Sequence, residues 1–305
     1  MTRSKRIPTM LASLVVGLFS VAPAAAQDSP VEVDALIEAR GIVSDLVLDQ
    51  GEGIDSSGAG MRGRIGMTYR PSERTQLRAE AEGRVFEFAD ADRQRLDTVI
   101  GRLEIAHQLN ETMTVEGFAR RFENISLLEA LSGDQTSLGG RLQWQRGADR
   151  LRATGEYRKR EYDTAVGGEG EGWRAALEYN RRLGSYHYVR FDLAIDRNDS
   201  DDEPRRSYDR RIASVLYSHP IGRRIRLRPR LEYREWDYDA RIARGDPDAA
   251  LREDSYVAPG IDLAWGRENR GIYGEFDFEY RFRRSNDERF DDNAARGSVR
   301  LGYRF

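Results

Sequence analysis

Cysteine is absent from the 305-residue sequence, which excludes disulfide bonds and cysteine-ligated metal sites. Lysine is nearly absent as well, because Lys5 and Lys159 are the only two among 49 basic residues. Arginine supplies the rest, and its guanidinium keeps its charge and forms forked pairs with carboxylates when partly buried. The arginine content fits either a bias of genome composition or extensive ion pairing, and both interpretations stay open.

Long apolar runs are missing after residue 26, so no transmembrane helix is expected in 27–305. The segment 1–26 has a basic start, an apolar stretch and an Ala-x-Ala site at 24–26, which predicts a cleaved signal peptide and export through the bacterial inner membrane. We expect a single domain over 27–305. Without the three basic residues of 1–26, 46 basic residues face 52 acidic ones, a balance that argues against nucleic acid as a partner.

Histidine is scarce, and the three histidines, His107, His187 and His219, do not have the spacing of metal ligands. Ser218 adjoins His219, but neighbouring residues on a strand point to opposite faces. The stretch 196–204 is dense in carboxylates, yet it lacks the glycine and the ordered spacing of a calcium loop. The sequence therefore predicts no enzyme, no catalytic residue, no metal site and no cofactor.

The chain does contain regular alternation. Charged residues make up 33% and hydrophobic residues 39%, which by itself is typical of disorder, but aromatic residues reach 10%. Apolar and polar positions alternate with a period of two, which predicts strands. The predicted strands are 32–43, 59–70, 76–88, 95–108, 113–124, 135–146, 150–163, 172–182, 187–198, 207–218, 224–238, 254–266, 271–284 and 294–305.

The faces of these strands indicate the fold class. In 271–284, for example, Phe276 and Phe278 alternate with Asp277 and Glu279. A soluble sandwich can also alternate, but charges at half of its strand positions would leave it a very small core. A transmembrane barrel needs one apolar face per strand and admits a polar interior. We therefore predict an all-β protein, a transmembrane antiparallel up-and-down β-barrel of about fourteen strands, with twelve to sixteen left open.

The connections alternate in length, as they do in outer-membrane barrels with short periplasmic turns and longer outer loops. This pattern places both ends of the barrel domain at the periplasmic side. The short connections are predicted at 71–75, 110–112, 147–149, 183–186, 219–223 and 267–270. The longer ones are predicted at 44–58, 89–94, 125–134, 164–171, 199–206, 239–253 and 285–293.

Aromatic residues gather on the apolar faces near the short connections. Trp and Tyr prefer membrane interfaces, where the ring meets hydrocarbon and the polar edge meets water. We therefore predict a lipid-interface girdle at the periplasmic end. It consists of Tyr69, Trp144, Tyr179, Tyr217, Trp265, Tyr303 and Phe305.

The final residues, "LGYRF" at 301–305, resemble the C-terminal strand of Gram-negative outer-membrane β-barrel proteins. In that family, alternate apolar positions and a final Phe form the sorting signal for the barrel-assembly machinery. The resemblance implies a bacterial outer-membrane location, contact with lipid and lipopolysaccharide, and the assembly machinery as a partner. The size is similar to monomeric porins and to barrels of exopolysaccharide or surface-lipoprotein export systems, and a monomer is expected.

Fourteen strands lie between barrels filled by side chains and barrels with an aqueous channel. The charged faces carry nearly as many carboxylates as arginines, which fits either cross-strand ion pairs that fix register or a selectivity ladder for anions. We expect the closing strand to pair with carboxylates at 32, 34 and 38 and at 275, 277 and 279. The predicted lining residues are Arg62, Arg64, Arg78, Glu80, Glu82, Arg84, Arg102, Glu104, Arg141, Arg152, Arg226, Arg228, Arg230, Glu275, Asp277, Glu279, Arg296, Arg300 and Arg304.

Two functional hypotheses follow from this fold. The first is an outer-membrane pore that passes small hydrophilic or charged solutes. The second is a non-conducting structural or accessory barrel of an exopolysaccharide or surface-lipoprotein export system. An outer-membrane hydrolase is disfavoured because all three histidines are expected at the periplasmic end, whereas such enzymes place their sites at the outer leaflet or above it.

Overall fold

The computed structural model describes residues 30–45, 57–89, 95–128, 131–163, 168–201, 206–266 and 270–305. The predicted signal peptide 1–26 and most of the predicted connection 44–58 lie outside the described residues. Fourteen strands follow one another: β1 (Val31–Ser44), β2 (Gly58–Ser72), β3 (Thr75–Phe88), β4 (Leu96–Gln108), β5 (Met113–Leu128), β6 (Leu131–Arg146), β7 (Asp149–Tyr162), β8 (Glu169–Gly184), β9 (His187–Ser200), β10 (Tyr208–Pro220), β11 (Ile225–Ile242), β12 (Leu251–Gly266), β13 (Gly271–Ser285) and β14 (Ala294–Arg304).

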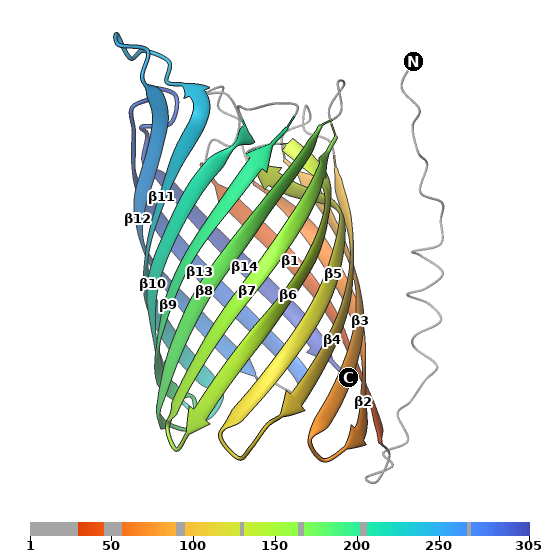
Figure 1. Cartoon of the computed structure of the whole chain (residues 1–305). Helices are drawn as coiled ribbons and strands as arrows, with labels where there is room; N and C mark the ends of the chain where they lie inside the picture. Colours follow the sequence, from red (N-terminus) through yellow and green to blue (C-terminus); the bar gives the residue numbers. More distant parts are fainter. Residues whose placement is uncertain are drawn as a thin grey trace.

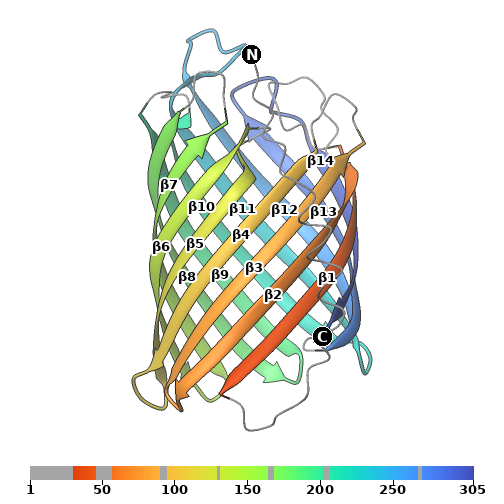
Figure 2. The same cartoon turned by 90° about the vertical axis from the view of Figure 1, so that its right-hand side faces the viewer.

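Each strand pairs with its neighbours in sequence, and β14 pairs with β1, so the sheet closes into a barrel of tilted strands (Figures 1 and 2). Every pairing is antiparallel, including the closing one between β1 and β14. The predicted fold class and the predicted number of strands are confirmed. Closure leaves no strand edge unpaired, which is the condition for a sheet that spans a membrane.

The apolar side chains point outward and the charged side chains point inward. On β13, Phe276 and Phe278 are 43% and 42% exposed, whereas Asp277 and Glu279 are 6% and 8% exposed. The same alternation surrounds the barrel with exposed Leu, Ile, Val and aromatic side chains. A continuous apolar belt of this kind is far larger than the patches that soluble proteins expose, so the belt indicates a lipid environment. In the described part of the chain, no helix has the length and apolar character needed to cross a membrane.

The short connections lie together at the lower end of the barrel in Figure 1, and the start of β1 and the end of β14 lie at this end too. We call it the short-turn end. One of these turns joins Arg146 to Asp149 through Gly147, whose φ of 58° requires the left-handed region that glycine adopts freely. The predicted alternation of short and long connections holds with one exception.

The exception is the predicted connection 125–134, which is wrong because β5 and β6 continue through most of it. A register shift between Phe122 and Ile125, with Asn124 at a φ of 52°, puts the residues beyond it out of phase with the strand. A bulge interrupts the period-two pattern, so the sequence there no longer reads as a strand. The predicted connection 239–253 is likewise too long, because β11 continues past a second register shift and rises with β12 above the other strands (Figure 1).

Candidate functional site

The inner wall of the barrel is the candidate functional site, because the buried and half-buried charged side chains of the strands gather there. Of the predicted lining residues, only Arg84 is exposed, and the others are buried or half-buried on the inner faces. They contact one another across strands rather than standing alone. Most of these residues belong to two networks of ion pairs or line two cavities.

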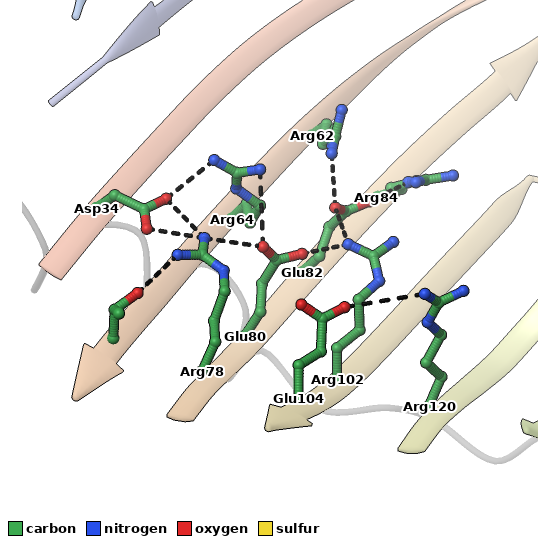
Figure 3. Close-up of polar contacts among 11 residues, drawn as sticks. Asp34, Arg62, Arg64, Arg78, Glu80, Glu82, Arg84, Arg102, Glu104 and Arg120 are labelled. Carbon is green, nitrogen blue, oxygen red and sulfur yellow. Dashed lines mark hydrogen bonds and ion pairs between the residues drawn. The ribbon is translucent and has the colours of Figure 1, made fainter. Parts of the chain in front are cut away.

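The first network joins β1 to β4 (Figure 3). Glu82 is fully buried and accepts a hydrogen bond of 2.7 Å from Nη2 of Arg62, while Arg84 and Arg102 also pair with it. Glu80 holds a further set of guanidiniums, including Arg102. The members are Asp34, Arg62, Arg64, Arg78, Glu80, Glu82, Arg84 and Arg102.

The second network joins β11 to β14 on the other side of the closing pair. Nη2 of Arg230 lies 2.8 Å from an oxygen of Asp277 and 2.8 Å from an oxygen of Glu279. Glu275 is shared by Arg228, at 2.8 Å, and by Arg300. The members are Arg228, Arg230, Asp262, Glu275, Asp277, Glu279, Arg281 and Arg300.

Glycines on the inner face let side chains reach across a whole strand. Arg230, Gly260 and Glu279 form one row on β11, β12 and β13, and a Cβ on Gly260 would lie 2.8 Å from Nε of Arg230. The guanidinium therefore passes over Gly260 to reach Glu279. In the same way, Arg78 passes close to Gly66 and pairs with Asp34 at 2.8 Å.

A third glycine lies at the closure of the barrel. Glu38, Gly302 and Tyr273 form a row on β1, β14 and β13. The hydroxyl of Tyr273 donates a hydrogen bond of 2.7 Å to Glu38, and a Cβ on Gly302 would lie 2.5 Å from the ring. These three glycine rows tie next-nearest strands together, which ordinary ladder hydrogen bonds do not do.

The register does not place the arginines of the closing strand opposite the carboxylates of β1, contrary to our expectation. Arg300 lies opposite Arg40, and Arg304 lies opposite Leu36. The carboxylate at 38 faces Gly302 instead of an arginine. The stagger that closes a barrel shifts the register, and nothing in either strand's own pattern reveals that shift. The predicted pairing with β13 is confirmed for Arg300, which contacts Glu275.

A cavity of about 320 Å³ lies along the inner wall between β11 and β2, near the short-turn end, and we call it the seam cavity. Six guanidiniums and two carboxylates line it, so this place is richer in arginine than in carboxylate. They are Arg62, Arg64, Arg226, Arg228, Arg300 and Arg304, with Glu38 and Glu275. A second cavity of about 300 Å³, on β3 to β5, is closer to balance, with Arg78, Arg102 and Arg120 beside Glu80 and Glu104.

A buried polar cluster on β6 to β10, at the end of the barrel opposite the short turns, was not predicted. Arg160 is 6% exposed and donates hydrogen bonds to Gln135, Asn198 and Tyr208 at 2.7 to 3.1 Å. The guanidinium of Arg206, from the connection between β9 and β10, lies 4.5 Å above the ring of Tyr162. The sequence shows that these residues alternate with apolar ones, but it does not show that they meet. The contacts join residues up to 48 positions apart.

Two of the three histidines meet at the short-turn end, which sequence spacing did not reveal. The rings of His187 and His219 lie 5.3 Å apart, and Nε2 of His187 is 2.8 Å from the hydroxyl of Tyr217. Among the described residues, no group of three or more His, Asp or Glu is arranged to hold a metal ion. The predicted girdle residues lie on the outer face near the same end, and Trp144, Tyr217 and Tyr303, for example, are exposed.

No protein-family model and no curated protein sequence matches the chain. Solved structures do match over nearly its whole length. A loop-deletion mutant of OmpT, an outer membrane protein of Vibrio cholerae, is 10% identical with a TM-score of 0.56, covering 91% of this chain and 100% of that chain. An anion-selective porin from Comamonas acidovorans is 9% identical with a TM-score of 0.52, covering 90% and 99%.

A bacterial polysaccharide outer membrane secretin is also similar, with 11% identity and a TM-score of 0.56 over 89% of this chain and 98% of that chain. At such low identities the likeness shows the fold and nothing finer. The chain has the closed antiparallel barrel fold of outer-membrane proteins, and a single fold can serve proteins with unrelated functions.

Proposed function

We propose that this protein is an outer-membrane pore that passes small hydrophilic or charged solutes. The observation that carries the proposal is the division of the strands, with an apolar belt outside and a charged wall with cavities inside. An inner wall of this kind attracts water and ions, and charged rings set the selectivity of pores. The solved porin with the same fold supports the proposal.

The same proposal includes the position of the pore in the outer membrane and its partners there. The exposed aromatics at the short-turn end form a girdle at the lipid interface, and the apolar belt contacts outer-membrane lipid and lipopolysaccharide. The strand that ends in Tyr303 and Phe305 engages the barrel-assembly machinery. The protein acts as a monomer, without a cofactor and without enzymatic activity.

Planar-bilayer recording with single-cysteine variants tests the pore. The chain has no cysteine, so one added thiol is the only target of a water-borne thiol reagent. Arg152→Cys places the thiol on the inner wall, and Leu142→Cys places it on the exposed outer face. We expect step-like conductance for both variants and a fall in current after labelling only for Arg152→Cys. A barrel without conductance, or equal block in both variants, contradicts the proposal.

A second candidate is a non-conducting accessory barrel of a polysaccharide or lipoprotein export system. The buried cluster around Arg160 and Arg206 favours it, because these side chains fill space near the outer end of the lumen. The similarity to the polysaccharide secretin points the same way. Absence of conductance together with co-purification of a periplasmic export partner would select this candidate over the pore.

A further inference from the structure

We propose that the seam cavity binds a small solute that carries two or more anionic groups, such as carboxylates or phosphates. The inference rests on the proposed function in treating this anion as the solute that the pore passes. The binding itself depends only on the residues of the cavity. This proposal names a class of solute for the inner wall, which the fold alone does not indicate.

Carboxylates around the cavity are shared among its guanidiniums and further arginines. Arg62 also pairs with Glu82, which Arg84 shares, and Arg228 also pairs with Asp262, which Arg230 shares. Glu38 already accepts the hydroxyl of Tyr273, and Glu275 is shared between Arg228 and Arg300. Each guanidinium has five N–H donors and no acceptor. An anion in the cavity would supply further acceptors to the exposed N–H groups through forked, charge-assisted hydrogen bonds.

A further arginine on the closing pair of strands, β1 and β14, adds positive charge next to the cavity. Arg300 lies opposite Arg40 across the seam, and in the described part of the chain Arg40 has no ion pair. Like charges directly opposite each other on neighbouring strands repel. Carboxylates placed there would have neutralised the wall, but the register puts Glu38 opposite Gly302. The seam therefore keeps an excess of positive charge that a bound anion offsets.

The size of the cavity limits the ligand. A volume of about 320 Å³ holds roughly ten water molecules at about 30 Å³ each. A small di- or tricarboxylate, or a phosphorylated or carboxylated monosaccharide, fits this space. Arg226 is buried, but the other lining arginines are partly exposed, and the side chain of Arg300, for example, is 31% exposed. A solute in the lumen can therefore reach them and leave again.

The binding site is tested by titrating the folded, detergent-solubilised barrel with citrate, with inorganic phosphate and with neutral maltose in a calorimeter. The variant Arg62→Gln/Arg300→Gln removes two donors without isolating a carboxylate, because Glu82 keeps Arg84 and Arg102, and Glu275 keeps Arg228. The matched control is Arg120→Gln, which removes an arginine from the second cavity. Gel mobility with and without heating shows that each variant has folded.

We expect wild-type barrel to bind citrate and not maltose, and added salt to weaken binding because it screens the charges. The double variant should bind citrate at least about tenfold more weakly, as expected when charge-assisted hydrogen bonds are lost. Arg120→Gln should match the wild type. The citrate and phosphate titrations distinguish carboxylated from phosphorylated solutes.

Three results overturn the inference: equal affinity for citrate and maltose, unchanged citrate binding in the double variant, or the same loss in Arg120→Gln. Conductance in potassium chloride is recorded on the same samples. A conducting barrel that does not bind citrate rejects the seam site and leaves the pore. A silent barrel that binds citrate through Arg62 and Arg300 rejects the pore and leaves the site.

Discussion

The hydroxyl of Tyr273 donates a 2.7 Å hydrogen bond to Glu38, and the tyrosine ring crosses the intervening strand β14 at Gly302. The two residues are 235 positions apart, so the contact joins the beginning of the barrel to its end. It forms only when β13, β14 and β1 are all in register. The row therefore acts as a clamp at the place where the sheet closes.

Replacing Gly302 with Ala should open this clamp. A Cβ at 302 would lie 2.5 Å from the Tyr273 ring, so the ring must move away from Glu38. Loss of a hydrogen bond to a charged group costs about 1.5–3 kcal/mol, and Tyr273→Phe should cost a similar amount. Urea-dependent unfolding of the barrel from lipid vesicles measures both changes.

The control for this clamp lies on the same strand. A Cβ on Gly297 would meet nothing within 4 Å, so Gly297→Ala should change stability by no more than about 0.5 kcal/mol. A loss as large in Gly297→Ala as in Gly302→Ala would mean that any alanine on β14 disturbs closure. Full stability of Tyr273→Phe would show that the hydrogen bond to Glu38 contributes nothing.

The strands and their faces could be predicted because one chemical rule decides them locally. A residue such as Phe278 faces lipid and its neighbour Asp277 faces the lumen. Apolar and charged residues therefore alternate along each strand. Bulges were missed where this phase breaks, as at Asn124. The fold class therefore follows from the local pattern of residues. The ends of the strands also depend on backbone bulges, which the composition does not reveal.

The partners of each charge could not be predicted, because they depend on register around the whole barrel. On the β1 side, Arg300 lies opposite Arg40 rather than a carboxylate because of the stagger at closure, whereas on the β13 side it pairs with Glu275. Some charged residues pair outside the inner wall, as Glu87 does with Arg95 and Asp199 with Arg197, and so they do not set its charge.

The row of Arg230, Gly260 and Glu279 should behave as a coupled unit. Gly260→Ala puts a Cβ 2.8 Å from Nε of Arg230, which displaces the guanidinium from Glu279. We expect a loss of about 1.5–3 kcal/mol in unfolding free energy, which is the range for a hydrogen bond to a charged group. A double-mutant cycle with Arg230→Gln measures the coupling, because the alanine should cost little once the arginine is gone.

Two results would count against this coupling. One is an additive double variant, in which Gly260→Ala costs the same with and without Arg230. The other is an equal loss in Gly63→Ala on β2, where a Cβ would have open space. Either result would assign the cost to backbone entropy or sheet packing rather than to the displaced guanidinium.

The aromatic girdle predicts the depth of individual tryptophans in the bilayer. Four tryptophans occur, so variants that keep one and replace the others with Phe are practical. Trp144 and Trp265 lie next to the short turns, whereas Trp236 packs against Tyr256 at a ring distance of 5.6 Å on the inner face. Lipids brominated near the headgroup should quench Trp144 and Trp265 more strongly than lipids brominated near the bilayer centre. Trp236 should be quenched by neither, and strong quenching of Trp236 alone would reverse the assignment of faces.

The connection 286–293 should lose its order in acid through one carboxylate. Asp287 is fully buried and accepts hydrogen bonds from Arg289, from Nε at 2.8 Å and from Nη2 at 2.6 Å. Burial alone would raise the pKa of Asp287, but the side-chain and backbone hydrogen bonds outweigh it and lower the pKa from 3.8 to about 2. A lowered pKa in the folded state stabilises the connection fully above about pH 4, by about 2 kcal/mol, and this stabilisation disappears as pH falls through about 2.

Hydrogen exchange of the peptide 285–293, corrected for the intrinsic rate at each pH, measures this loss. Wild-type protection should be constant from pH 7 to 4 and fall between pH 4 and 2. Asp287→Asn cannot bind Arg289 as an anion, so its protection should be low at every pH. Asp292→Asn removes an exposed carboxylate from the same connection and should leave the wild-type profile unchanged. Because only the Asp287 carboxylate combines full burial with bonds from Arg289, an acid transition that persists in Asp287→Asn would mean that another group holds the connection.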